Sequence, residues 1–159
     1  MSESVLNLAS AIQLAKAAEK KASELYGAAA REAVNPLVKR LFEQLTEFEG
    51  YHYRKLVELE RSLKEEGAFI EYKEFDQTPM PTTGEVTRIE GVKKTSAAKV
   101  FKQAMESEAK AAERYTGLAD QTSDPQGRQM FLKLAKEERG HYSVLQASYY
   151  DVSNLKPLA

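Results

Sequence analysis

Apolar residues recur at alternating spacings of three and four along most of the chain. The second such stretch is the clearest, with apolar positions at Val38, Leu41, Phe42, Leu45, Phe48, Leu56 and Leu59. This spacing gives a helix one apolar face, as in a helix that packs into a bundle. Because the same spacing occurs before residue 35, after residue 96 and after residue 125, the pattern predicts four amphipathic helices.

Two proline-containing turns join these helices in pairs. Asn35-Pro36 and Asp124-Pro125 each supply an N-cap residue followed by proline at the first helical position. Gly67 is typical of the position just past a helix end. Because short connections make neighbouring helices antiparallel, we predict two helical hairpins, at about residues 4–66 and 96–150.

Residues 67–95 lack the helical spacing and include Pro79, Pro81, Gly84 and Gly91. So long an irregular stretch is unusual in a compact domain. It is explained if it crosses the length of the bundle and makes the third helix parallel to the second. We expect its apolar residues to form a short strand or a helical turn on the bundle surface; these are Phe69, Ile70, Tyr72 and Phe75. We expect Glu71 and Glu74 to be solvated.

Polar residues interrupt the apolar stripes at matching places in the two hairpins. Glu49 and His52 form a Glu-x-x-His motif, and Glu138 and His141 repeat it 89 residues later. The spacing of three puts both side chains of a motif on one helix face. The same offset relates two more pairs, Glu19 with Glu108 and Tyr26 with Tyr115. An identical offset without a gap indicates two hairpins of one geometry.

Four such helices would bring four carboxylates and both histidines of the chain to one level of the core. Buried carboxylates at this density cannot all stay charged without cations, and two divalent ions would balance them. One Glu from each of two helices, with a Glu-x-x-His from each of the other two, is the ligand pattern of ferritin-like di-iron proteins. We therefore predict a dinuclear metal site with the ligands Glu19, Glu49, His52, Glu108, Glu138 and His141.

The ligand types favour some metals and arrangements over others. Carboxylates with one imidazole per ion suit iron, manganese or zinc. Two glutamates could bridge the ions, while each Glu-x-x-His contributes a terminal carboxylate and an imidazole. The matched offsets also predict that loss of either histidine weakens one metal position by a similar amount.

Tyr26 and Tyr115 each lie seven residues after their Glu on the same stripe. Because helical side chains lean toward the N-terminus, each phenol could hydrogen-bond a ligand carboxylate; the alternative is a core aromatic with some other partner. Glu106 and Glu137 fall off the stripes and are expected at the surface. The pattern assigns no partner to the second ring nitrogen of either histidine.

Composition narrows the function classes. The 159 residues fit one domain, residues 1–159, and the net charge of −1 gives no reason to expect a nucleic-acid partner. There is no cysteine, so thiolate metal sites and thiol nucleophiles are excluded. No apolar run reaches the roughly 20 residues of a membrane span, and residues 1–10 lack the pattern of a secretory signal. We expect a cytoplasmic protein without a membrane partner.

These motifs resemble the rubrerythrin branch of the ferritin-like superfamily over nearly the whole chain. The resemblance implies an all-α, ferritin-like four-helix bundle, two antiparallel hairpins joined by a long crossover, a centre of two iron ions and oxidoreductase chemistry. Two features depart from that family. Rubrerythrins carry a rubredoxin domain with a four-cysteine iron, and they carry a further Glu one turn after the third-helix Glu. Here position 111 is Ala, as is the equivalent position 22.

Three functions follow as hypotheses. The chain could reduce hydrogen peroxide or dioxygen with electrons from an external donor such as a rubredoxin, acting as a homodimer. It could instead bind, oxidise and pass on iron as an iron-handling ferroxidase. It could also be a metalloprotein without enzymatic activity.

Overall fold

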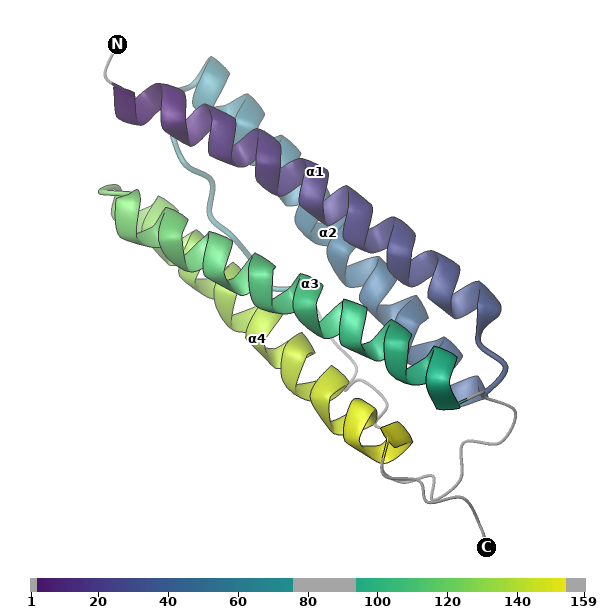
Figure 1. Ribbon diagram of the computed structural model, residues 1–159. Helices are drawn as coiled ribbons and strands as arrows, with labels where there is room; N and C mark the ends of the chain where they lie inside the picture. The colour runs from purple at the N-terminus through teal and green to yellow at the C-terminus, as the bar shows by residue number, and fades with distance from the viewer. Residues whose placement is uncertain (1–2, 76–93, 154–159) are drawn as a thin grey trace, which may run out of the picture.

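The computed structural model describes residues 3–75 and 94–153 of the chain. They form four long helices, α1 (Glu3–Glu32), α2 (Pro36–Glu65), α3 (Lys94–Gln121) and α4 (Pro125–Ser153). The predicted all-α four-helix bundle is confirmed (Figure 1). Helix α3 begins slightly before the predicted start of the second hairpin, and α4 continues past its predicted end at about residue 150 to Ser153. The helix can continue because no proline lies between Pro125 and Pro157.

Both predicted helix caps are present. The Asn35 side chain accepts hydrogen bonds from the backbone N–H groups of Leu37 and Val38, at 2.9 and 3.2 Å. Asp124 accepts in the same way from Gln126 and Gly127, at 2.9 and 3.1 Å. These bonds satisfy donors that a helix start leaves free, so each hairpin turns at the same kind of motif.

The helices pair as the two predicted hairpins. Helix α1 packs along α2 and α3 packs along α4, while α1 and α3 make the smaller contact between the hairpins. In Figure 1, α2 and α3 run in the same direction, as a long crossover between the hairpins requires. Most of that crossover, including its prolines and Gly84 and Gly91, lies outside the described residues.

The described start of the crossover forms neither a strand nor a helical turn, contrary to expectation. Gly67 ends α2 with a φ of 66°, which glycine adopts easily. The chain then packs against the second hairpin. The Phe69 ring occupies the space where a side chain at Gly127 would be, and it meets the Phe131 ring edge-on. Tyr72 is only 3% exposed, so this segment contributes to the core, not just to the surface. Glu71 and Glu74 are exposed, as expected.

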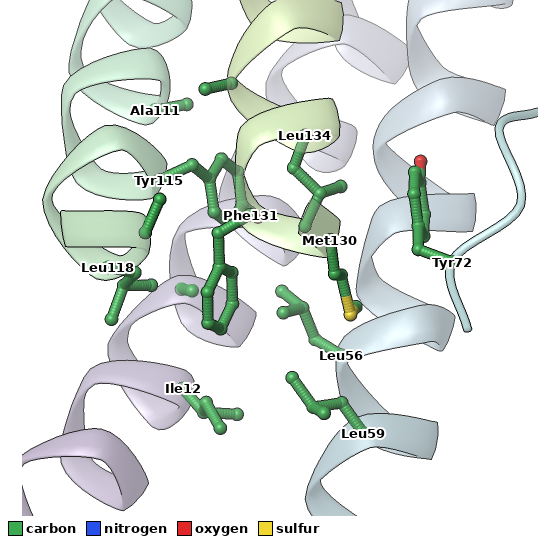
Figure 2. Close-up of a cluster of buried hydrophobic side chains, with 13 residues drawn as sticks. Ile12, Leu56, Leu59, Tyr72, Ala111, Tyr115, Leu118, Met130, Phe131 and Leu134 are labelled. Carbon is green, nitrogen blue, oxygen red and sulfur yellow. The ribbon is translucent and has the colours of Figure 1, made fainter. Parts of the chain in front are cut away.

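Two apolar clusters fill the bundle on either side of a polar layer. One contains Ile12, Leu56, Leu59, Tyr72, Leu118, Met130, Phe131 and Leu134. Figure 2 shows these side chains converging from all four helices, with the Tyr72 hydroxyl pointing away from Ile12 and Leu59. The other contains Tyr26, Val38, Leu41, Phe42, Leu45, Phe101 and Leu145. None of the helices, over their described residues, is long and apolar enough to cross a membrane.

Candidate metal centre

The six residues singled out in the sequence meet in the layer between the two apolar clusters. Each helix contributes to the group, because every one of these residues replaces an apolar residue on an inward stripe. None is more than 3% exposed; they are Glu19, Glu49, His52, Glu108, Glu138 and His141. Large apolar residues on both sides keep bulk water away from the two ends of this layer.

The side chains converge closely enough to hold metal ions. Nδ1 of His52 lies 2.7 Å from Glu138, 3.6 Å from Glu49 and 3.7 Å from Glu19. Nδ1 of His141 lies 3.3 Å from Glu49 and 3.7 Å from Glu108. Both histidines therefore turn the same ring nitrogen toward the carboxylates.

Two groups of four potential ligands result, and within each group the ligand atoms lie within 4.8 Å of one another. The first group is Glu19, Glu49, His52 and Glu138, and the second is Glu49, Glu108, Glu138 and His141. Glu49 and Glu138 belong to both groups. The sequence interpretation made the glutamates of the two Glu-x-x-His motifs terminal ligands. Their shared position would instead suit residues that serve both ions, and Glu19 and Glu108 would each serve one.

Many polar atoms of this layer lack a hydrogen-bond partner within the described residues. Eight buried atoms of the six residues have none: His141 Nε2 on the outer side, and seven ligand-type atoms, which are Glu19 Oε2, Glu49 Oε1, His52 Nδ1, Glu108 Oε2, both carboxylate oxygens of Glu138, and His141 Nδ1. A buried polar atom without a partner costs about 1–3 kcal/mol. Seven in one layer, all lone-pair donors of the kinds that bind iron, manganese or zinc, fit a pair of divalent ions.

The pKa shifts show how the layer balances its charge without metal. Burial, with the charges of neighbouring carboxylates, raises the pKa values of Glu49 and Glu138 well above the usual range. Burial opposes charge on the histidines too, but Glu138 and Glu19 raise the pKa of His52, and Glu108 and Glu49 raise that of His141 to about 9. Burial and the neighbouring charges thus favour a bound proton on each of these four residues in the metal-free layer.

The other two glutamates remain ionised. Burial alone would raise the pKa of Glu108, but its contact with Glu138 and the charge of His141 lower it to about 2. The pKa of Glu19 is likewise lowered against burial, by Glu49 and His52. Protons on the four residues with raised pKa values would thus reduce the negative charge of the metal-free layer, as divalent ions would in the metal-bound one.

Two tyrosines hold these ionised glutamates, and each reaches across to the other hairpin. The Tyr26 hydroxyl donates to Glu108 at 2.9 Å, and the Tyr115 hydroxyl donates to Glu19 at 2.5 Å. Burial and the adjacent carboxylate raise the pKa of both phenols, which keeps them neutral donors. The sequence suggested hydrogen bonds from these tyrosines to ligand carboxylates. It did not indicate that each tyrosine would bond a glutamate of the other hairpin.

Glu137 is the residue that the sequence interpretation missed. It was expected at the surface, yet its side chain is only 7% exposed and lies 2.5 Å from Nε2 of His52. The Tyr72 hydroxyl donates to both of its oxygens, at 2.8 and 3.0 Å. His52 therefore has a carboxylate on its outer nitrogen, and that carboxylate is fixed by the crossover.

His141 has no such partner. The position equivalent to Glu137 in the first hairpin is Phe48, whose ring meets the His141 ring edge-on with centroids 4.6 Å apart. Nε2 of His141 is buried with no hydrogen-bond partner in the described part of the chain. The sequence did contain a signal for this difference, because the offset that relates the hairpins puts a charged residue opposite a core phenylalanine.

A cavity of about 400 Å³ connects the layer with the surface between α1 and α3. All four ligand-type glutamates contribute to its lining, together with Ala22 and Ala111. Ala22 and Ala111 occupy equivalent positions in the two hairpins, and their small side chains leave space for the cavity. Lys21, Lys110 and Arg114 line the outer part.

Fold and site together define a four-helix bundle with a buried carboxylate and histidine cluster compatible with a di-iron centre. The family model that describes rubrerythrin matches residues 1–60, which confirms the predicted resemblance to a ferritin-like di-iron family over α1 and most of α2.

Among solved structures, the chain is similar to a hypothetical protein from Pyrococcus furiosus. The two are 27% identical, the match covers 95% of this chain and 93% of the other, and the TM-score is 0.73. No curated protein matches the chain.

Proposed function

We propose that the protein is a non-haem di-iron oxidoreductase that reduces hydrogen peroxide, with electrons from an external donor. The observation that carries this proposal is the single buried layer in which seven unpartnered ligand atoms face one another. The match to the rubrerythrin family supports iron as the metal, because that family typically binds iron.

Each of the two ions would have one imidazole and three carboxylates near it. Glu19 and Nδ1 of His52 would serve one ion, Glu108 and Nδ1 of His141 would serve the other, and Glu49 and Glu138 would serve both. Two adjacent ferrous ions would supply one electron each, which matches the two-electron cleavage of an O–O bond. The carboxylates, which can carry or release protons, would take up the change in charge.

The protein's own part in the reaction is to position the ligand side chains and to exclude bulk water. Tyr26 and Tyr115 hold the terminal glutamates in place through their hydroxyl groups. The apolar clusters close the layer at both ends, so the cavity between α1 and α3 gives a small oxidant its way in. The small side chains of Ala22 and Ala111 line this route.

The electron donor is a separate part of the proposal. The 159 residues contain no cysteine, so they hold no thiolate-bound iron that could supply electrons. We propose that a small redox protein such as a rubredoxin delivers them.

Stopped-flow mixing tests the proposal. Anaerobic diferrous protein is mixed with hydrogen peroxide or dioxygen at equal concentration, then given a reduced rubredoxin-type donor. We expect faster oxidation by peroxide and repeated turnover with the donor. The matched control is the double variant Glu49→Gln/Glu138→Gln, which should hold no iron and show neither reaction.

Two other outcomes would contradict the proposal and identify its alternatives. Faster oxidation by dioxygen, with uptake of many iron ions per chain, would favour an iron-handling ferroxidase. Absence of reaction with both oxidants, in protein that holds two ions, would leave a metalloprotein without this activity.

A further inference from the structure

The two halves of the layer present the same inward ligands but different outer contacts. On each side, a histidine uses Nδ1, a terminal glutamate accepts from a tyrosine, and the same two shared glutamates lie between. Outside this set, His52 contacts Glu137 and His141 contacts Phe48. Any difference in metal affinity between the two positions should therefore come from what the histidines contact on their outer side, where Nε2 lies.

A carboxylate on the outer nitrogen changes a histidine ligand in two ways. Because a carboxylate only accepts, Glu137 requires the His52 proton to be on Nε2, which leaves Nδ1 free to bind metal. The negative charge also makes the imidazole a stronger donor of its lone pair. Tyr72 holds Glu137 from the far side, so the orientation is fixed by a residue outside the four helices.

His141 lacks both effects. Its ring meets the Phe48 ring at an interplanar angle of 73°, and its Nε2 is buried with no hydrogen-bond partner within the described residues. When Nδ1 binds metal, the proton on Nε2 therefore stays buried without a partner, which disfavours the metal-bound form. Among the described residues, the ring is therefore held by polar contacts only on its inner side, where Nδ1 faces Glu49 and Glu108.

We propose that Glu137 is a positioning residue that makes the two metal positions unequal, so that the position at His52 binds a divalent ion more tightly than the position at His141. This inference rests on the proposed metal centre. Partners of this kind on a histidine ligand typically change metal affinity by about 10–100-fold. The protein should thus fill in two steps, with an intermediate that holds one ion at His52.

Cobalt(II) chloride is a suitable probe, because it takes the same ligands and its binding is visible by absorption. Metal-free protein is titrated without oxygen, by calorimetry and absorption together. We expect two ions per chain, with affinities that differ by about 10–100-fold. Glu137→Gln keeps the shape but removes the charge, so it should weaken the tighter position by a similar factor and leave the weaker one unchanged. Glu113→Gln, at an exposed site on α3, is the charge-matched control.

Proton NMR of the cobalt-loaded protein assigns the tighter position. A cobalt-bound histidine gives a shifted signal from its Nε2 proton, and we expect the His52 signal to persist longer in D₂O because Glu137 holds that proton. The variant His141→Ala should retain the persistent signal, and Glu137→Gln should lose it. A role for Glu137 in packing alone would not move this signal.

Several results would overturn the inference while leaving the metal centre intact. These are two equal affinities in the wild-type protein, a Glu137→Gln variant weakened at both positions or at neither, or a persistent signal that belongs to His141. Failure to bind any cobalt would overturn the metal centre and the proposed function together, so the two failures can be told apart.

Discussion

The two histidines occupy equivalent places in the two hairpins, yet their surroundings differ on the side away from the carboxylates. His52 contacts a buried carboxylate that the crossover fixes, whereas His141 meets a phenylalanine ring in a T-shaped contact. The inward ligands follow the repeat of 89 residues, and the outer contacts do not. Repetition in a chain thus fixes where ligands lie, while the strength of each ligand depends on residues that the repeat does not constrain.

The largest effect on metal content should come from substituting Glu49 or Glu138, which the two halves share. Glu49→Gln or Glu138→Gln should remove both ions, whereas Glu19→Gln or Glu108→Gln should remove or weaken one, because only the first pair belongs to both ligand groups. With free metal at 100 times Kd, each ion stabilises the fold by about 2.7 kcal/mol. Elemental analysis and melting curves measure the two effects. Retention of two ions by both shared-glutamate variants would refute the site.

The histidine variants compare the halves directly. We expect His141→Ala to retain one ion at the affinity of the tighter position. His52→Ala should retain one ion that binds about 10–100-fold more weakly, since only His52 has the carboxylate partner. Calorimetry with cobalt or zinc gives both constants. Equal residual affinities would mean that the halves are equivalent, as the repeat alone predicted.

Proton release should be the same for both halves. The pKa values of Glu49, Glu138 and His52 are raised well above their ordinary values, and that of His141 is raised to about 9. Because these shifts favour the protonated forms and metal binds the deprotonated ones, protons compete with the ions, so metal binding should weaken as pH falls. We expect protons to be released when each ion binds, measured by calorimetry in buffers of different ionisation enthalpy. Binding that does not depend on pH between 6 and 8 would contradict this.

The smallest effect on metal affinity should come from a substitution in the crossover. Tyr72→Phe removes the hydroxyl that holds Glu137 and leaves the carboxylate beside His52. A hydrogen bond to a charged group contributes about 1.5–3 kcal/mol, and only part of that loss should reach the metal. We expect a loss of affinity at the tighter position of less than tenfold, with the His141 position unchanged. Tyr53→Phe removes a hydroxyl on α2 that makes no hydrogen bond within the described residues, and it is the control.

The helices that carry this site and its six inward side chains could be predicted from the sequence, for identifiable reasons. Helix spacing, two Asx-Pro turns and a gapless repeat were enough to predict four helices and the meeting of six side chains. Glu137 escaped because it lies about 100° around α4 from Glu138, and only α2 and the crossover make that direction part of the interior. Which glutamates lie between the two positions also depended on how the hairpins dock, and helix spacing does not contain that information.

The hydrogen bonds that support the ligands have a consequence for how the chain folds. Tyr26 to Glu108, Tyr115 to Glu19, and His52 to Glu137 each join one hairpin to the other, across 82, 96 and 85 residues of sequence. Each hairpin can form through contacts between near neighbours in sequence, while these three contacts require a long loop to close, which is entropically unfavourable and slow. Neither hairpin alone contains a supported ligand set. Capture of metal during refolding would therefore mark the moment when the two hairpins dock.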